Sequence, residues 1–239
     1  MPVFVLTHYA EETTALFRND NNGFFSDNRW AAKVAVSGLG LVGWGTAFLD
    51  FDNDGNDDLF ITDGHLVDNI QLLRDTASYA QKNQLFINKS GTFGQVLYSP
   101  ESIVGRGVAY GDFDNDGNAD ILVTNNNQQS ILYRNTWAGR NHWITIQLVG
   151  TKSNRDGIGS KVIIVTGGKT RIKQSNGGGS YLSASDHRLH FGLVNSSIID
   201  QLVVHWPSGT TDQFRDVPGD QFIRIEEHGG MTRLESAMM

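Results

Sequence analysis

Short apolar runs separated by clusters of Gly, Asn and Asp recur along the whole chain. Residues 59–62 and 121–124 are continuous apolar or β-branched runs, whereas residues 143–148 alternate between apolar and polar positions. Runs of this kind, bounded by turn-forming residues, are typical of β-strands. The pattern therefore predicts a mostly β protein. Residues 66–81 do not follow this strand pattern, and there we expect a short helix or a loop that passes over one face of the protein.

The predicted strands belong to longer repeats. Residues 43–50 match residues 105–112, and a Leu-aromatic-x-Asn element occurs at residues 16–19, 85–88 and 132–135. Periodic short strands with regularly placed Gly, Asp and aromatic residues are typical of propeller blades and related β repeats. The repeats therefore predict a partial β-propeller, with an incomplete unit at its start.

A nine-residue acidic loop occurs twice within these repeats. The first acidic loop, residues 50–58, reads Asp-Phe-Asp-Asn-Asp-Gly-Asn-Asp-Asp, and the second acidic loop, residues 112–120, reads Asp-Phe-Asp-Asn-Asp-Gly-Asn-Ala-Asp. Ca²⁺ prefers about six to eight oxygen ligands. The carboxylates at positions 1, 3, 5 and 9, with the backbone carbonyl at position 7, approach that number, and without a cation they would repel one another. The loops therefore predict about two bound Ca²⁺ ions.

The charge of the chain supports a metal-binding interpretation. The formal net charge is −7 over 239 residues, and the nine Asp of the two loops equal the excess of acidic over basic residues in residues 1–139. Nucleic-acid binding is excluded because it needs a basic stripe. The chain contains no Cys, which excludes disulfides, zinc-thiolate sites and thiol catalysis.

The sequence contains no recognisable membrane-spanning segment or signal peptide. No apolar run approaches the roughly 18 residues of a membrane span. The first eight residues have no basic start and too short an apolar stretch for a signal peptide. We expect that a signal has been removed or lies upstream of a truncated chain.

Near residue 140 the pattern changes to alternating strands separated by turn clusters, as at residues 153–157, 166–169 and 176–179. This predicts a small antiparallel β domain. The expected organisation is calcium-binding repeats at residues 1–139, the β domain at residues 140–228 and a frayed tail at residues 229–239.

These residues carry a family resemblance. Residues 1–139 resemble the FG-GAP/VCBS repeats of integrin α-chain propellers and of many secreted bacterial proteins. Residues 140–228 resemble the ASPIC/UnbV domain, named from cartilage acidic protein and a bacterial relative. The most specific pieces of the second resemblance are residues 141–143, 148–159, 178–183, 188–193 and 206–209.

The resemblance implies that the loop aspartates bind calcium. Carried over by position, the implied ligands are Asp50, Asp52, Asp54, Asn56 (through its carbonyl) and Asp58 in the first acidic loop, and Asp112, Asp114, Asp116, Asn118 (through its carbonyl) and Asp120 in the second. The family's propellers have about seven blades, and two blades cannot close a ring or hide their edges. We therefore expect the C-terminal piece of a longer chain, an assembly such as a homo-oligomer, or an open β stack, and we favour the first.

Catalysis has little support in the residues. His187, His190 and His205 lie near Asp186 and Asp200 and would be the candidates for a metal or acid–base cluster, but a histidine in a strand is more often a satisfied polar group. The Gly-rich residues 177–180 would bind phosphate only if they opened a helix, and residues 181–183 predict a strand instead. No nucleophile elbow, phosphate loop or His-Glu-x-x-His motif is present, so we do not expect an enzyme.

The function expected from these features is a calcium-stabilised scaffold for protein or glycan interaction, secreted or at the cell surface or in the periplasm. An alternative is an accessory or catalytic subunit of a bacterial biosynthetic pathway, as the bacterial namesake of the domain suggests. A further alternative is a carbohydrate-binding module, which would use exposed aromatic residues among Trp44, Trp137 and Trp206.

Overall fold

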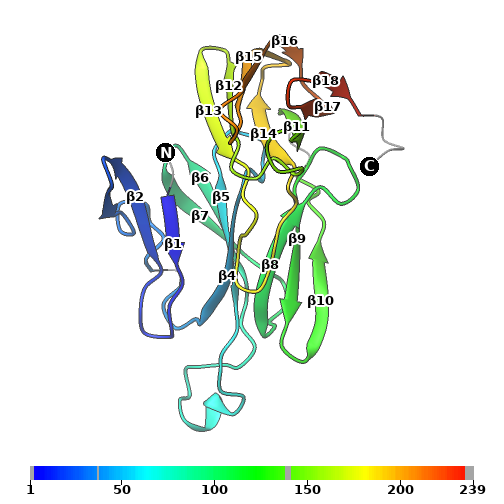
Figure 1. Ribbon diagram of the computed structural model, residues 1–239. Helices are drawn as coiled ribbons and strands as arrows, with labels where there is room; N and C mark the ends of the chain where they lie inside the picture. The colour runs from blue at the N-terminus through cyan, green and yellow to red at the C-terminus, as the bar shows by residue number, and fades with distance from the viewer. Residues whose placement is uncertain (1–2, 37, 138–140, 235–239) are drawn as a thin grey trace.

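The computed structural model describes residues 3–36, 38–137 and 141–234, and these residues form five β-sheets (Figure 1). Three sheets come from the repeats. The first blade consists of β1 (Val3–Leu6), β2 (Ala15–Asn21) and β3 (Phe24–Asp27). The second blade consists of β4 (Gly43–Leu49), β5 (Asp58–Asp63), β6 (Gln84–Lys89) and β7 (Thr92–Tyr98), and the third of β8 (Gly105–Gly111), β9 (Asp120–Asn125) and β10 (Gln128–Tyr133).

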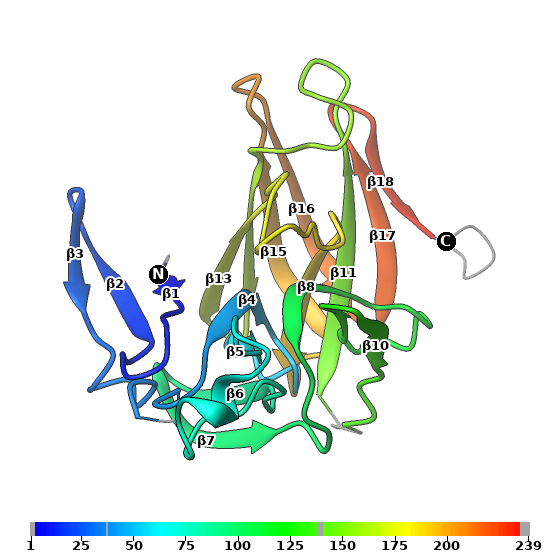
Figure 2. The ribbon, with the colours of Figure 1, turned by 90° about the horizontal axis from the view of Figure 1, so that it is seen from below.

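The three blades fan outward, with β4 and β8 side by side near the centre (Figure 2). All strand pairs within them are antiparallel. Apolar side chains fill the two spaces between blades: one cluster joins the first and second blades around Ile61 and Phe86, and another joins the second and third around Phe60 and Ile121. The prediction of a mostly β, partial propeller is confirmed.

The incomplete unit at the start is the first blade, whose three strands correspond to β5, β6 and β7 of the second blade. The register supports this match, because Phe4 pairs with Phe17 as Leu59 pairs with Phe86. Leu59 and Phe86 are fully buried, whereas Phe4 is about two-fifths exposed. The outer face of the first blade therefore presents the apolar side chains that the second blade buries against its neighbour.

Residues 141–234, here called the C-terminal domain, fold into two four-stranded sheets. One sheet has the order β14 (Leu189–Val194), β11 (His142–Val149), β17 (Gln221–Glu226), β18 (Gly230–Arg233). The other has the order β13 (Lys169–Gln174), β12 (Lys161–Thr166), β15 (Ile198–His205), β16 (Thr211–Pro218). A single apolar core lies between them, with Ile144, Ile164, Phe191 and Leu202 fully buried.

Two details differ from the sequence-based expectations. The pairing of β11 with β17 is parallel, although every other pair in the domain is antiparallel. Residues 230–233, expected in a frayed tail, form β18 because they complete a hairpin with β17. The expected boundary between residues 139 and 140 lies outside the described residues.

The insertion at residues 66–81 is an excursion from the second blade, between β5 and β6. It contains the short 3₁₀ helix η1 (Ile70–Leu72) and projects away from the C-terminal domain (Figure 1). Ile70 is buried, but Leu72 and Leu73 are largely exposed.

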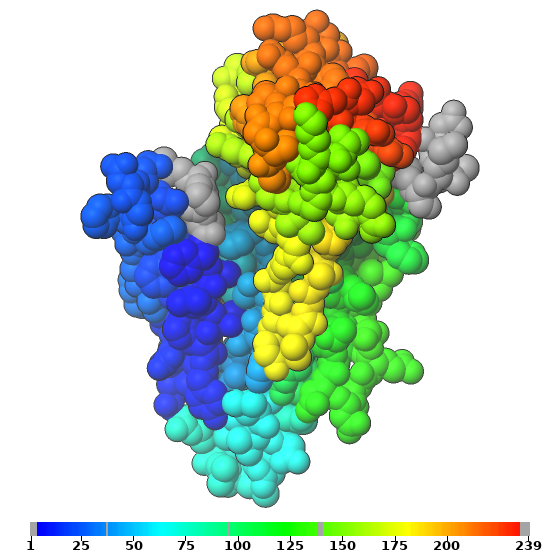
Figure 3. Space-filling view, viewed as in Figure 1, coloured from blue at the N-terminus to red at the C-terminus, as the bar shows by residue number. Residues whose placement is uncertain are grey.

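Residues 175–188, here called the strap, leave the C-terminal domain and lie over β4 and β8 (yellow in Figures 1 and 3). The Ser180 hydroxyl accepts a hydrogen bond from the Thr46 amide (2.7 Å), and the Asp186 amide donates to the Tyr110 carbonyl (2.9 Å). The strand expected at residues 181–183 is instead a turn within the strap. The strap thus satisfies polar backbone groups of two neighbouring blades, which unpaired strand edges would otherwise expose.

The matching Gly-x-Gly sequences of β4 and β8 have a steric cause. A Cβ on Gly45 would lie 2.8 Å from the Arg106 carbonyl oxygen and 2.9 Å from the Ser180 hydroxyl. A Cβ on Gly107 would lie 2.5 Å from the Ser183 hydroxyl. Glycine therefore lets the blades and the strap approach closely.

The core of the C-terminal domain provides the first testable prediction. Phe191 has no exposed surface, so Phe191→Ala removes buried apolar area and leaves a cavity. We expect urea denaturation to show the free energy of unfolding lowered by about 3–5 kcal/mol. Phe24→Ala is the matched control, since Phe24 is 72% exposed and its truncation should change little. Equal effects of the two substitutions would contradict the assigned core.

Candidate metal centre

Each acidic loop connects two consecutive strands of one blade. The first connects β4 to β5 in the second blade, and the second connects β8 to β9 in the third blade. They meet each other beside the C-terminal domain. The side-chain amide of Asn53 donates to the Gly117 carbonyl (3.1 Å), and the Asn135 side chain donates to the Phe51 carbonyl (2.8 Å). Neighbouring blades are therefore joined through their acidic loops.

The loops adopt the same backbone conformation. Asn53 and Asn115 have φ angles of 57° and 58°, and Gly55 and Gly117 have φ angles of 80° and 87°. Asn and Gly are the residues that tolerate this left-handed region best. The shared sequence thus encodes one turn geometry, used twice.

The last aspartate of each loop is held by backbone amides. The Asp58 carboxylate accepts from the amides of Phe51 (2.9 Å) and Asn88 (2.7 Å). Asp120 repeats this arrangement with Phe113 (2.9 Å) and Asn135 (2.7 Å). The Asn of the Leu-aromatic-x-Asn element therefore fixes the end of the loop, which explains why the two motifs occur together.

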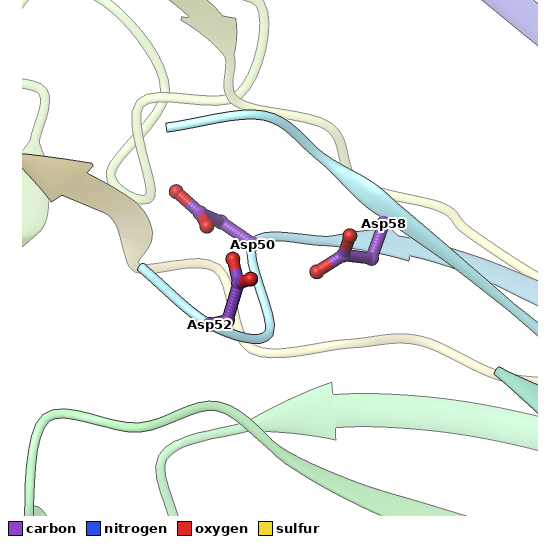
Figure 4. Close-up of side chains that lie close together, drawn as sticks. All are labelled: Asp50, Asp52 and Asp58. Carbon is purple, nitrogen blue, oxygen red and sulfur yellow. The ribbon is translucent and has the colours of Figure 1, made fainter. Parts of the chain in front are cut away.

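Three carboxylates converge in each loop. One oxygen from each of Asp50, Asp52 and Asp58 lies within 4.8 Å of the other two, and Figure 4 shows their arrangement. In the second acidic loop the group of three is Asp112, Asp114 and Asp116, from loop positions 1, 3 and 5 instead of 1, 3 and 9. Of the predicted carboxylate ligands, Asp54 and Asp120 lie outside these groups of three.

The first group is deeply buried. Asp50 is 2% exposed and Asp58 is fully buried. Burial raises the pKa of Asp50 to about 7 and that of Asp58 to about 8, because a low dielectric disfavours the charged form. Within the described part of the chain, Asp50 Oδ1 is buried without a hydrogen-bond partner. An all-oxygen set with an unsatisfied buried oxygen fits a hard divalent cation.

The second group is more open. Burial raises the pKa of Asp112 to about 6, while Asp114 and Asp116 are exposed. The Asp112 carboxylate is satisfied within its own loop, by the amides of Asp116 (3.0 Å) and Gly117 (2.8 Å). The two loops therefore share a backbone but differ in burial.

The carboxylates at positions 3 and 5 of each loop contact a basic side chain of the same blade. The Lys89 ammonium lies 2.7 Å from both Asp52 and Asp54. Arg134 pairs with Asp114 and Asp116. The sequence pattern did not identify these two residues, although each adjoins the Asn of the Leu-aromatic-x-Asn element. They compensate part of the loops' charge from the solvent side.

The predicted carbonyl ligands, Asn56 and Asn118, lie at equivalent turns. Their amides donate to Asp54 (2.9 Å) and Asp116 (2.9 Å), respectively. These bonds hold the turn that follows each carboxylate at position 5. Coordination through the two carbonyls stays a prediction.

The three candidate histidines have separate surroundings. His190 is partly buried, with Nδ1 2.8 Å from the Thr145 hydroxyl and Nε2 2.6 Å from the Asn53 side-chain oxygen. Burial lowers its pKa to about 3, so the ring is neutral. His187 and His205 are exposed, and His205 contacts Thr211. Among the described residues, no group of three potential metal ligands includes them.

The candidate tryptophans differ in exposure. Trp206 is buried and its ring nitrogen donates to Asp212 (2.7 Å), and the Arg106 guanidinium lies 4.2 Å from the centre of the Trp44 ring. Trp137 is exposed. Of the three, only Trp137 presents an open aromatic surface.

Glu227 is an acidic residue that the sequence pattern did not single out. Its carboxylate accepts from the consecutive amides of Thr151 (2.9 Å), Lys152 (2.8 Å) and Ser153 (2.7 Å), and from the Ser208 hydroxyl. Against the cost of burial, these hydrogen bonds lower its pKa to about 2. Glu227 thus ties two loops to the end of β17, and both loops lie in the stretches that carry the ASPIC/UnbV resemblance.

Two family models match the chain. Residues 150–232 match the model described as ASPIC and UnbV, and residues 73–123 match the model described as FG-GAP-like repeat. The chain therefore carries an FG-GAP-like repeat followed by an ASPIC/UnbV domain, as the resemblance implied, which indicates a propeller-type extracellular or interaction protein. The repeat match includes the whole second acidic loop, residues 112–120, and ends within β9.

No curated protein matches the chain. Among the described residues, no helix is long and apolar enough to cross a membrane.

The pH dependence of stability tests the role of Glu227. Its folded pKa of about 2 lies below the ordinary value of 4.5, so its contribution is present above about pH 4.5 and is lost as the pH falls toward 2. We expect Glu227→Gln to lower the urea midpoint at pH 7, and the difference from the wild type to shrink below pH 4.5. Glu226→Gln, which removes a half-exposed surface pair with Arg224, is the control with little expected effect. A Glu227→Gln protein as stable as the wild type at pH 7 would contradict this role.

Proposed function

We propose that the chain is a calcium-stabilised scaffold for interaction with a protein or glycan outside the cytoplasm. The observation that carries the proposal is the first acidic loop, where three carboxylates converge and Asp50 Oδ1 is buried without a partner. The second acidic loop repeats the backbone conformation and the convergence of three carboxylates. The acidic loops and the FG-GAP-like match support calcium as the cation.

The residues assigned to the cation come from both ends of the first acidic loop and from the first half of the second. Asp50, Asp52 and Asp58 would hold it in the first acidic loop, and Asp112, Asp114 and Asp116 in the second, with Asp54, Asp120 and the carbonyls of Asn56 and Asn118 as further candidates. The ion supplies positive charge that compensates the buried carboxylates. The aspartates themselves join the end of one strand to the start of the next, β4 to β5 and β8 to β9.

A structural role is favoured over a catalytic one. A cation surrounded by four carboxylates and a carbonyl has little room for substrate. Both ring nitrogens of His190, the candidate closest to the site, are hydrogen-bonded to Thr145 and Asn53, and the exposed His187 and His205 form no cluster with it among the described residues. A catalytic subunit therefore stays an alternative without a supporting cluster. Carbohydrate binding stays an alternative, because Trp137 and Tyr181 are exposed.

The proposed location follows from the affinity of such sites. Extracellular modules bind Ca²⁺ with Kd values of about 10⁻⁴–10⁻³ M. Sites of this class fill at the millimolar calcium found outside cells and stay largely empty in the cytosol. We therefore propose a secreted, periplasmic or cell-surface location.

Thermal unfolding in chelator, in Ca²⁺ and in Mg²⁺ tests the proposal. In millimolar Ca²⁺, about tenfold above a Kd of roughly 10⁻⁴ M, each site stabilises the native state by about 1.4 kcal/mol, and the two sites together by about 2.8 kcal/mol. For a chain of this size that is a rise in Tm of roughly 5–10 °C, expected for Ca²⁺ and much smaller for Mg²⁺, which retains water and accepts fewer carboxylates.

The double substitution Asp52→Ala with Asp114→Ala should abolish the calcium-dependent rise. The control is Asp68→Ala with Asp75→Ala, which removes the same charge from exposed positions in the insertion and should leave the rise intact. If the loop variant keeps the same Tm difference between chelator and millimolar Ca²⁺ as the wild type, the loops are not the calcium sites.

A further inference from the structure

The first acidic loop covers the open edge of β14, a strand of the C-terminal domain. β14 is the outermost strand of its sheet, and an edge strand presents backbone groups that need partners. The Gly192 amide donates to Asp50 Oδ2 (2.9 Å), and the Val194 amide donates to the Asn53 carbonyl (3.2 Å). Asp50 Oδ2 also accepts from the Gly55 amide of its own loop (2.9 Å), so this converging carboxylate is held jointly by its loop and by the C-terminal domain.

The approach of β14 to the loop leaves no room for a side chain. A Cβ on Gly192 would lie 2.3 Å from Asp50 Oδ2 and 2.4 Å from the backbone carbon of Asn53. Real Cβ contacts are never this short, so any larger residue would push the strand and the loop apart. Glycine at this position permits the hydrogen bond to Asp50.

Other contacts join the same two surfaces. The Lys173 ammonium lies 2.7 Å from Asp57, and the Asn141 side chain donates to the Asp52 carbonyl (2.9 Å). The His190 ring contacts the Asn53 side chain (2.6 Å). Every loop residue in these contacts is a candidate ligand or lies between two of them. The conformation of the first acidic loop and the seating of the C-terminal domain are thus fixed by the same residues.

The second acidic loop is contacted differently. Arg188 donates to the Asp112 carbonyl (3.2 Å) and to the Asn115 side chain (3.3 Å), while the Asp112 carboxylate accepts from amides of its own loop. The C-terminal domain therefore contacts the backbone of this loop and the Asn115 side chain, and the hydrogen bonds that position the Asp112 carboxylate come from within the repeat.

We propose that the first acidic loop is a cation site shared between domains, in which the Gly192 amide positions Asp50, and that cation binding there is coupled to the docking of β14. This rests on the proposed calcium binding and specifies how that site is regulated. Coupling is reciprocal: a docked C-terminal domain raises the affinity of the first loop, and a bound cation strengthens docking. The second acidic loop binds its cation with much weaker coupling.

The test uses the full chain with Gly192→Ala, which changes no candidate ligand. After treatment with chelator, calorimetric titration with Ca²⁺ should resolve two sites in the wild type. We expect Gly192→Ala to weaken one site about tenfold or more, within the usual range of coupling, and to leave the other unchanged. Gly178→Ala is the matched control in the same domain, because a Cβ there meets nothing within 4 Å, and it should titrate like the wild type.

A second measurement keeps the test valid if Gly192→Ala folds poorly. In the wild type, hydrogen exchange of the Gly192 and Val194 amides should slow when Ca²⁺ replaces chelator, since both donate to the first acidic loop. The amide of Val203, in the centre of the other sheet, should not respond beyond the general gain in stability.

The outcomes separate the two proposals. Wild-type protein that binds no Ca²⁺ overturns the proposed function and this inference with it. Two calcium sites that are unaffected by Gly192→Ala, with exchange at Val194 independent of Ca²⁺, overturn the inference alone and leave the calcium-stabilised scaffold in place.

Discussion

The structure depends on how it accommodates negative charge at the junction of its two domains. Asp50 and Asp58 are buried together there, and an isolated buried carboxylate is costly unless it is hydrogen-bonded or paired with a cation. Backbone amides hold Asp58 on both oxygens, Lys89 neutralises the outer carboxylates, and Gly192 takes one oxygen of Asp50. The remaining oxygen of Asp50 has no hydrogen-bond partner, and the proposed cation would supply the missing interaction there.

At the same junction, each domain covers exposed strand edges of the other. The strap lies over β4 and β8 and bonds to their backbones (Figure 3), and the first acidic loop covers β14. Each domain therefore protects edges of the other. The outer face of the first blade is different, because Phe4 and Phe25 are exposed there. Further blades or a second copy remain the expected neighbours of that face, as a propeller of two complete blades predicts.

The parts that followed from sequence are those encoded locally. The acidic loop and the Leu-aromatic-x-Asn element specify a turn and the amides that hold it, so spacing alone located both loops. Contacts between distant segments carry no such signal: Gly192 and Asp50 are 142 residues apart, and the parallel pairing of β11 with β17 joins strands from opposite ends of the domain. Lys89, Arg134 and Glu227 were missed because a single basic or acidic residue near a strand end does not reveal its partner. The strand predicted at residues 181–183 is wrong because the apolar Tyr181 and Leu182 form a turn where the strap crosses the repeats.

The most direct test of calcium binding at this junction is anomalous diffraction from crystals grown with Ca²⁺ and from crystals soaked with Tb³⁺ as its substitute. We expect two peaks, one among Asp50, Asp52 and Asp58 and the other among Asp112, Asp114 and Asp116, with the first beside the Gly192 amide. Ordered acidic loops without a peak at either position would contradict the account, since the buried carboxylates would then be stabilised without a cation.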